Sequence, residues 1–365
     1  MTGTNPVHHR SARPTIKEVA SAAGVSTQTV SRVINERPDV SPETRKRVQD
    51  IIDELGYQPS ALARSLIRQR SYTLGVVTSG LRFIGPSRTL GGITSTADEL
   101  GYSLLLKEQP RFDANDVTPT FQKLLARHVD GIIWAVPEVG ENRSWVDHLP
   151  LDLEVPVVYL TMHPSKTVSV VSIDNCKGAR LAVAHLLEQG YRHIGHISGP
   201  LDWWEARERL AGWKDTLGEA GYKVRDTHWV EGNWGSASGA QAIRTLHDQY
   251  PEMDAVFVGN DQMALSVLQF ACRTGLRVPE DLGIVGFDNI PEAAFFWPPL
   301  TTVNQDQYAV GKMAVEQIIR IIETAWQGEE PTKPETTLLA PALVIRQSSL
   351  LPRELGEKEV SLKGD

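Results

Sequence analysis

Five polar or charged residues follow apolar, strand-like runs of the chain, where they can act on a ligand. They are Arg207, Arg209, Asn260, Asp261 and Asp288. Guanidinium, amide and carboxylate groups are planar, and each can bind two vicinal hydroxyls through paired hydrogen bonds. We therefore expect this set to hold a polyhydroxylated small molecule such as a sugar.

Tryptophan is abundant, with nine residues in a chain of 365. Four of them fall in predicted loops, namely Trp203, Trp204, Trp234 and Trp297. The face of an indole ring packs well on the apolar face of a pyranose, which favours a role in sugar binding. The alternative is that these rings fill the core or a dimer interface, and the sequence leaves both interpretations open.

Motifs of enzyme chemistry are absent from the sequence. The chain contains no GxGxxG, GxxxxGKS/T, GxSxG, HExxH or CxxC pattern. The segment Gly235–Gly239 has the spacing of a nucleophile elbow, but its central residue is Ala237. His193 and His196 flank a predicted strand and need not share a face, so we expect no metal site there. We expect a binding protein without cofactor or metal, not an enzyme.

A second set of side chains suits DNA. Residues 26–35 are short and polar on the predicted outward face, and Arg32 is their only charged member. In the major groove a glutamine can pair bidentately with adenine and an arginine with guanine, so Gln28 and Arg32 are candidate base readers. The other polar side chains suit phosphate oxygens, and they are Ser26, Thr29, Ser31 and Asn35. The alternative is a solvated helix in a small helical domain.

Three predicted helices position these residues. Each begins at a residue that can cap it, and two of them end at a glycine. The caps are Thr15 (with Glu18 as its capping-box partner), Ser26 and Ser41, and the glycines are Gly24 and Gly56. The short turn between the first two helices indicates a helix-turn-helix unit.

The net charge of −8 is unevenly distributed. Residues 1–72 hold eleven Lys or Arg and seven Asp or Glu, whereas the remainder has twelve more acids than bases. A basic head on an acidic body suggests that only the head meets a polyanion. Residues 60–68 follow the head and are too few to form a stable helix alone. Leu66 in this segment is a candidate wedge for a minor groove, and the alternative is a flexible linker.

The rest of the chain alternates strand-like runs with helical patterns, which predicts parallel sheets covered by helices. Two such sheets fit the length, with a ligand cleft between them at the carboxyl ends of the strands. The expected strands are 73–78, 103–106, 131–134, 157–159, 170–173, 194–197, 255–258 and 283–286. The expected helices are about 88–100, 117–128, 177–189, 205–220, 236–249 and 260–274.

The sequence contains no long apolar segment, and this bears on the cellular compartment that we expect. The longest apolar stretches are four to six residues, and the first fifteen residues contain no apolar signal-like region. Cys176 and Cys272 are the two cysteines, and we expect both to be buried free thiols in a reducing cytoplasm.

The segment Thr15–Ile67 resembles the DNA-binding head and hinge of the lactose-repressor family of bacterial regulators. Several segments of the body are similar to the lactose-responsive branch of that family. They are Val77–Arg88, Ser198–Trp213, Glu231–Ala240, Gly259–Ser266 and Trp297–Gln307. The resemblance covers about residues 14–350, nearly the whole chain.

This resemblance implies a small all-α helix-turn-helix head plus an α/β periplasmic-binding-protein-like core of two parallel-sheet subdomains. It implies a homodimer on palindromic double-stranded operator DNA, with no membrane contact. The implied DNA-contacting residues are Thr15, Ser26, Thr27, Gln28, Thr29, Ser31, Arg32, Asn35, Ala63 and Leu66. The implied effector-binding residues are Ser79, Phe83, Pro86, Thr161, Glu205, Arg209, Trp234, Asn260, Asp288 and Gln305.

The domain boundaries expected from the same resemblance are these. Residues 1–13 form a disordered extension, 14–58 the DNA-binding domain, 59–71 the hinge and 351–365 a flexible tail. Residues 72–350 form the effector-binding and dimerisation domain. Its first subdomain takes about 72–172 and 306–333, and its second about 173–304 and 334–350.

Four positions depart from the lactose-responsive pattern. Thr27 and Gln307 replace aromatic residues, Thr161 replaces an acidic effector contact, and Glu205 replaces a serine. The operator and the sugar are therefore expected to differ. The tail after Arg353 lacks a leucine heptad, so we expect a dimer without the family's tetramer seam.

The resulting hypothesis is a nucleoid-associated cytoplasmic repressor of carbohydrate-utilisation genes. A galactoside-like or other disaccharide would bind between the lobes and release the operator by favouring a second lobe orientation. The opposite polarity, in which sugar promotes DNA binding, also occurs in the family. A sugar-uptake binding protein and an α/β carbohydrate enzyme are the rivals, and neither explains the helix-turn-helix head.

Overall fold

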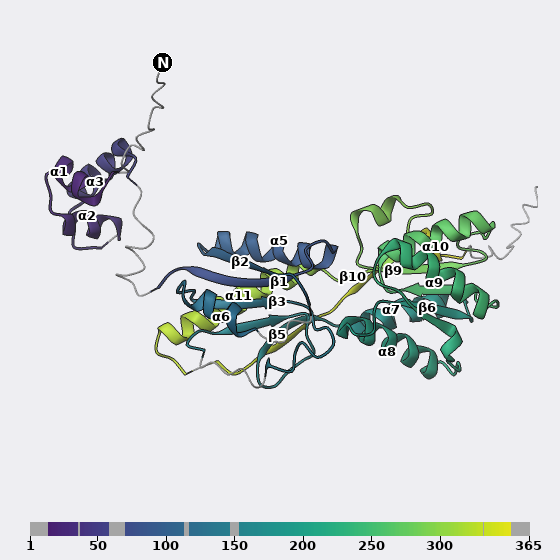
Figure 1. Cartoon of the computed structure of the whole chain (residues 1–365). Coiled ribbons are helices and arrows are strands. Elements are labelled where there is room, and N and C mark those ends of the chain that lie inside the picture. The colour runs from purple at the N-terminus through teal and green to yellow at the C-terminus, as the bar shows by residue number, and fades with distance from the viewer. Residues whose placement is uncertain are drawn as a thin grey trace, which may run out of the picture. The chain divides into compact units, whose positions relative to one another are not determined.

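The chain forms two compact units, Met1–Tyr72 and Thr73–Asp365 (Figure 1). The structure is a computed structural model that describes residues 14–35, 37–57, 70–112, 117–146, 153–330 and 332–351. Each unit has its own hydrophobic core. Within these residues no helix is both long and apolar enough to cross a membrane.

The first unit is the predicted helix-turn-helix. Its helices are α1 (Ile16–Ala23), α2 (Thr27–Ile34) and α3 (Pro42–Leu55), and they pack on a core centred on Val19, Val30 and Val48. All three helix starts are capped as expected, because the side-chain oxygens of Thr15, Ser26 and Ser41 accept backbone N–H groups. Gly24 and Gly56 end α1 and α3 in the left-handed conformation, with φ of 65° and 60°.

The first lobe of the second unit is a wholly parallel sheet in the order β11-β5-β4-β3-β1-β2. Its strands are β1 (Thr73–Ser79), β2 (Ser103–Gln109), β3 (Gly131–Ala135), β4 (Val157–Leu160), β5 (Ser169–Ile173) and β11 (Thr336–Leu339). The helices of this lobe are α5 (Ile84–Glu99), α6 (Thr118–Leu125) and α11 (Gln307–Trp326).

The second lobe has the strand order β12-β10-β9-β8-β6-β7, parallel except for β12 against β10. Its strands are β6 (Ile194–Ser198), β7 (Trp229–Glu231), β8 (Ala255–Val258), β9 (Gly283–Phe287), β10 (Thr301–Asn304) and β12 (Ala342–Val344). The helices are α7 (Asn175–Gln189), α8 (Trp204–Glu219), α9 (Ser236–Gln249) and α10 (Asp261–Thr274). Short 3-10 helices are η2 (Asp226–His228), η3 (Pro291–Phe295) and η4 (Gln347–Ser349).

The chain passes between the lobes three times, after β5, after β10 and after β11. The expected boundary at residue 334 lies too early, because β11 pairs with β5 and so belongs to the first sheet. The sequence patterns also named no strand at β7, β10, β11 or β12 and no helix at α11. These four strands have only three or four residues, and they are stabilised by pairing with the neighbouring strand.

Two loops add direct contacts between the lobes. The N–H of Gly140 donates to the carbonyl of Asp202 at 2.7 Å, and the N–H of Trp204 donates to the carbonyl of Glu138 at 3.0 Å. The Glu138 carboxylate also lies 3.4 Å from the guanidinium of Arg207. These bonds join the end of the first lobe's sheet to the start of α8 in the second lobe.

The two cysteines are free thiols, as expected. The expected burial is wrong, because Cys176 is half-buried and Cys272 is exposed.

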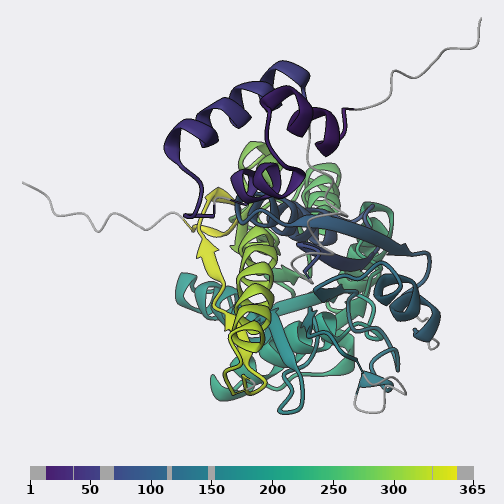
Figure 2. The ribbon, with the colours of Figure 1, turned by 90° about the vertical axis from the view of Figure 1, so that its left-hand side faces the viewer.

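Helices α5 and α11 touch backbone to backbone (α11 is the long yellow-green helix of Figure 2). A Cβ placed on Gly92 would lie 2.1 Å from the carbonyl oxygen of Tyr308, and one on Gly311 would lie 2.1 Å from that of Thr89. Only glycine permits this approach, which fixes α5 on α11. The contact matters because both helices start at the cleft.

Gly92→Ala is expected to lower the free energy of unfolding of the core by about 2 kcal/mol, because α5 and α11 must separate. The neighbouring Gly91 is the matched control. A Cβ there meets nothing within 4 Å, so Gly91→Ala should stabilise α5 by up to about 1 kcal/mol. Urea unfolding followed by tryptophan fluorescence measures both changes, since all nine tryptophans lie beyond residue 130. Equal effects of the two substitutions would refute the close-packing argument.

Candidate functional site

The outward face of α2 carries the residues expected to read bases. Thr27, Gln28 and Arg32 are exposed. Thr27 and Gln28 form no side-chain hydrogen bond within the described residues. Arg32 lies 3.2 Å from Asp39, and both side chains are about half exposed. An ion pair this exposed contributes little stability, so the guanidinium is available to another acceptor.

The residues expected to contact phosphates have structural tasks as well. Ser26 accepts the N–H of Thr29 at 3.0 Å, and Asn35 donates through Nδ2 to the carbonyl of Ser31 at 2.7 Å. Thr15 forms its capping box with Glu18. These side chains sit at the two ends of α2 and at the start of α1. Ala63 and Leu66 lie outside the residues that the structure describes.

A cavity lies between the two lobes, at the carboxyl ends of the strands. The space between its walls is about 640 Å³, open solvent at the mouth included. Nine of the ten expected effector residues line it: Phe83, Pro86, Thr161, Glu205, Arg209, Trp234, Asn260, Asp288 and Gln305. Ser79 does not, because its hydroxyl donates to the carbonyl of Gln109 and it borders an adjacent cavity.

Arg209 is the buried cation of this cavity, with 4% of its surface exposed. It projects from α8, where Nε donates to the side chain of Asn175 at 2.9 Å and Nη1 donates to the carbonyl of Gly259 at 2.6 Å. Nη1 also lies 4.0 Å from Oδ1 of Asp288. Its Nη2 has no hydrogen bond within the described residues, so one donor end remains for a ligand.

The half-buried Asp288 begins a chain of hydrogen-bonded polar side chains that runs from the second lobe to the first. Nε2 of Gln305 donates to Asp288, Nε2 of Gln307 donates to Gln305 at 2.7 Å, and the hydroxyl of Thr89 donates to Gln307 at 2.8 Å. Burial raises the pKa of Asp288 to about 6, and the Arg209 guanidinium opposes this rise. The chain connects a candidate ligand group directly to α5.

Asn260 proves to have a structural task. Its Oδ1 accepts the N–H of Met263 at 2.9 Å and so caps α10, while its Nδ2 donates to the carbonyl of Trp234 at 2.9 Å. The amide therefore holds the Trp234 loop against the start of α10. Its Nδ2 also donates to Oε1 of Gln262 at 3.5 Å, so only a lone pair of Oδ1 is left for a hydroxyl.

Unlike Arg209, Asp288 and Asn260, Glu205 has no side-chain hydrogen-bond partner among the described residues. It is 8% exposed in the first turn of α8, and within the described residues its carboxylate accepts no hydrogen bond and joins no ion pair. Burial raises its pKa to about 7; Arg209 lowers it, and the carboxylates of Asp288 and Glu138 raise it further.

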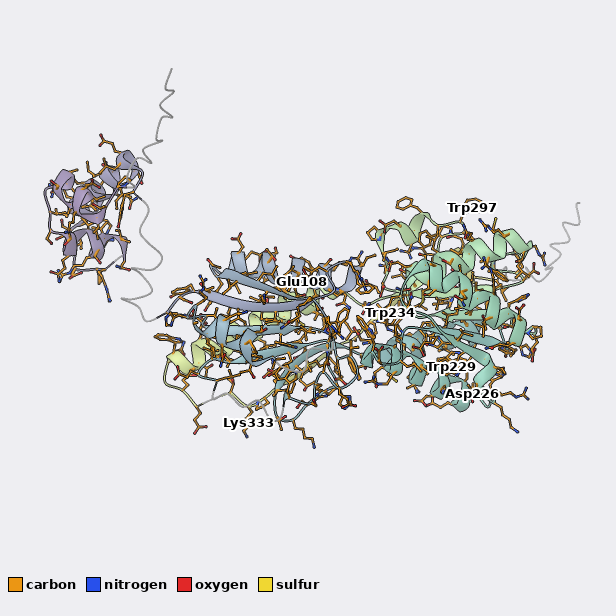
Figure 3. The ribbon with its side chains drawn as sticks, viewed as in Figure 1. Glu108, Asp226, Trp229, Trp234, Trp297 and Lys333 are labelled. Atoms are coloured by element: carbon orange, nitrogen blue, oxygen red, sulfur yellow. The ribbon has the colours of Figure 1, made fainter. Side chains whose placement is uncertain are left out.

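Aromatic rings form one wall of the cavity. The ring of Trp203 lies 5.9 Å from those of Phe83 and Trp234, edge to face in both pairs. Figure 3 shows Trp234 at the junction of the two lobes, whereas Trp297 lies on the outer surface of the second lobe. Of the four loop tryptophans, Trp203 and Trp234 therefore line the cavity, Trp204 is buried in α8 and Trp297 is 92% exposed.

Three lining residues have a backbone that ordinary side chains rarely adopt. Thr161, Trp234 and Asp288 have φ values of 57°, 69° and 117°. Such positions carry strain that the surrounding structure must hold, and they concentrate at ligand sites. The indole of Trp234 also covers Gly199 so closely that a Cβ there would meet it at 2.1 Å.

Sequence reasoning missed six lining residues: Ile84, Gly85, Thr89, Ala135, Pro137 and Gln262. It named Trp203 as a candidate for the sugar face and Gln307 as a departure from the lactose-responsive pattern, without placing either among the expected contacts. Gln262 and Gln307 each follow an expected contact, Asn260 or Gln305, by two positions. This proximity in sequence could have indicated that they line the cavity. Thr89 carried no such signal, because only the packing of α5 on α11 brings it to the cavity.

Within the described ranges, no three His, Cys, Asp or Glu side chains lie close enough together to hold a metal ion. His196 is fully buried between the rings of Trp213 and Phe257, and burial lowers its pKa to about 3. It is a core residue rather than a ligand.

Comparison with known proteins agrees with this arrangement. Residues 15–60 match the family described as bacterial regulatory proteins, lacI family, and residues 183–349 match the periplasmic binding protein-like domain. The lactose operon repressor of Escherichia coli (strain K12) is 33% identical over 339 residues, which cover 93% of this chain and 91% of that protein.

Two solved structures are similar over nearly the whole chain. The lac repressor dimer bound to operator and the anti-inducer ONPF superposes with a TM-score of 0.81 at 33% identity, covering 93% of this chain and 99% of that one. The complex of the transcriptional regulator CelR with cellobiose has a TM-score of 0.66 at 33% identity, covering 92% and 100%.

The chain therefore belongs to the lacI family of bacterial regulatory proteins. The expected fold class is confirmed: a helix-turn-helix head and a core of two mostly parallel sheets. Family membership also confirms the expectation of a DNA-binding transcriptional regulator and not an enzyme.

The raised pKa of Glu205 predicts how stability depends on pH. Between the ordinary value of 4.5 and about 7, the folded protein binds a proton that the unfolded chain has lost, so stability falls as pH rises through this window. From pH 5 to pH 8 the wild-type core should lose about 2–3 kcal/mol more than Glu205→Gln. Urea unfolding at both pH values checks this. Glu252→Gln, at an exposed residue of the same lobe, is the control and should behave as wild type.

Proposed function

We propose that this protein is a homodimeric repressor of carbohydrate-utilisation genes, released from a palindromic operator by a sugar bound between its lobes. One observation carries the proposal: the same chain joins an exposed, hydrogen-bond-rich helix face to a buried cavity lined by Arg209, Asp288 and an aromatic wall. The first suits base edges and the second suits a polyhydroxylated ring.

On DNA, Thr27, Gln28 and Arg32 would read bases from α2. Ser26, Thr29, Ser31, Asn35 and Thr15 would position the head on the phosphates. Residues 59–71 would form the hinge, with Ala63 and Leu66 at the operator centre. We infer that the protein acts on chromosomal DNA in the cytoplasm, where such an operator is found.

In the cavity, Arg209 and Asp288 offer a donor and an acceptor to adjacent hydroxyls, and Trp234 offers a flat apolar face. A second cavity, of about 1180 Å³ with open solvent included, adjoins the first and shares Phe83, Trp203 and Trp234 with it. Two adjoining cavities with a common aromatic wall suit a sugar of more than one ring. The CelR relative, whose structure contains cellobiose, supports a disaccharide effector.

The dimer is supported by an exposed aromatic surface on the second lobe. Phe295 and Trp297 are 86% and 92% exposed, and large aromatic side chains this exposed typically mark an interface. The similar lac repressor structure is a dimer on its operator. A two-fold dimer presents two copies of α2 to the two halves of a palindrome.

The proposed switch is an orientation change of the lobes. The bound sugar favours one lobe orientation, and the hinge segments of the DNA-bound dimer favour the other. The sugar can shift the equilibrium between the two orientations only by its differential affinity for them.

The test is fluorescence anisotropy with a palindrome from the protein's own upstream region and a scrambled duplex, at a stated salt concentration. Release by one sugar of a disaccharide panel supports the proposal, and tighter binding with a sugar would reverse its polarity. Binding without preference for the palindrome would contradict it.

Gln28→Ala is expected to weaken binding to the specific operator about tenfold to a hundredfold, because it removes a bidentate base contact. Binding to the scrambled duplex should change little, since phosphate contacts remain. Gln49→Ala is the matched control in the same unit, because Gln49 is exposed on α3 and bonds to Asp53. Equal losses on both duplexes would assign Gln28 to phosphate or structure instead.

Arg209→Ala is expected to keep operator binding and to weaken the sugar by about tenfold to a hundredfold, because it removes charge-assisted hydrogen bonds to hydroxyls. Arg209→Lys tests whether charge alone suffices, and Arg277→Ala, at an exposed arginine of the same lobe, is the control. Anisotropy with the sugar titrated in measures release. A variant that still releases DNA at wild-type sugar concentrations would show that the effector binds elsewhere.

A further inference from the structure

The charges that line the cavity are not balanced. Two carboxylates, Glu205 and Asp288, face one guanidinium, Arg209, among the described lining residues. The remaining polar side-chain groups of the lining are amides, hydroxyls and the indole N–H groups of two tryptophans, which carry no charge. The cavity therefore has a surplus of one negative charge when both carboxyls are ionised.

The two carboxylates differ in how they are satisfied. Asp288 accepts a hydrogen bond from Gln305 and lies beside Arg209. Glu205 is more buried, at 8% exposed against 15% for the side chain of Asp288, but has neither kind of partner within the described residues. Glu138, the third carboxylate of this region, lies behind the cavity and is fully engaged by the N–H of His163, Arg143 and Arg207.

A buried carboxylate without a partner is costly, and a bound ligand can remove the cost by donating a hydrogen bond. A hydroxyl meets this need without adding charge. A phosphate or carboxylate group on the ligand would instead be brought beside Glu205 and Asp288, and Arg209, the one arginine among the described lining residues, cannot neutralise all three negative groups.

We propose that Glu205 selects the effector by charge: its carboxylate accepts a hydrogen bond from a hydroxyl of a neutral sugar and excludes sugar acids and phosphorylated sugars. The proposal rests on the proposed function, since it names the chemical class of the sugar in the same cavity. Arg209 and Asp288 bind hydroxyls on one edge of the sugar, and the tryptophans pack on its face. Glu205 accepts a hydrogen bond from a hydroxyl on a second edge.

The experiment uses sets of sugars that differ by one group. One set is glucose, glucosamine, glucuronate and glucose 6-phosphate; a second is the galactose series; and a third pairs lactose with lactobionate and cellobiose with cellobionate. Binding to the full-length protein without DNA is measured by calorimetry at pH 8, where Glu205 is ionised. In the set that binds, the neutral member should bind at least about tenfold tighter than its anionic counterpart.

Glu205→Gln separates the effect of charge from that of shape. It should weaken the neutral sugar by about tenfold and narrow the gap between neutral and anionic members by at least about threefold, because the repelling charge is gone. Glu208→Gln is the control on the same helix, since Glu208 does not line the cavity. Operator affinity and the tryptophan emission spectrum show whether each variant is folded.

Three results would overturn the proposal. They are an anionic sugar that binds the wild type as tightly as its neutral partner, an amino sugar that binds at least about tenfold tighter than that partner, and an unchanged preference in Glu205→Gln. The amino-sugar result would mean that Glu205 pairs with an ammonium group. If no sugar of any charge binds, the proposed sugar effector itself fails, and the charge preference fails with it.

Discussion

The half-buried carboxylate of Asp288 is the point at which a chain of polar side chains joins the two lobes. It follows β9 in the second lobe, lies beside Arg209 there, and accepts a hydrogen bond from Gln305 in the segment that leads to α11. Gln307 and Thr89 continue the connection to α5. A ligand hydroxyl that bonds to Asp288 joins the carboxylate to which Gln305 already donates. Ligand binding in one lobe is thereby coupled to the position of a helix in the other.

This coupling is effective only if α5 moves as a rigid part of its lobe. The backbone contact of Gly92 and Gly311 with the facing helix supplies that rigidity, because it leaves no room for sliding between α5 and α11. The bonds of Gly140 and Trp204 across the lobes limit motion on one side of the cleft. The remaining freedom is rotation of one lobe about the three connecting segments, the hinge motion typical of two-lobed binding domains.

The sequence predicted those features that local chemistry decides. The caps Thr15, Ser26 and Ser41 and the terminating glycines of the head depend on neighbours in the chain, and the structure has them all. Apolar runs located eight strands. What was missed depends on contacts distant in sequence: the short edge strands, the meeting of Thr89 with Gln307 across 218 residues, and the displacement of Ser79 by its bond to Gln109. The structural task of Asn260 was hidden for the same reason.

The three passages of the chain between the lobes also constrain how the protein is made. The first sheet receives its helix α11 and its edge strand β11 only after strands β6 to β10 of the second lobe have been synthesised. During translation the ribosome must therefore release about nine-tenths of the chain before Val170 gains its partner Thr336. Until then β5 presents an unpaired, apolar edge, which is the kind of surface on which chaperones act and aggregation begins. The topology that couples the lobes in the finished protein thus makes the nascent chain dependent on protection.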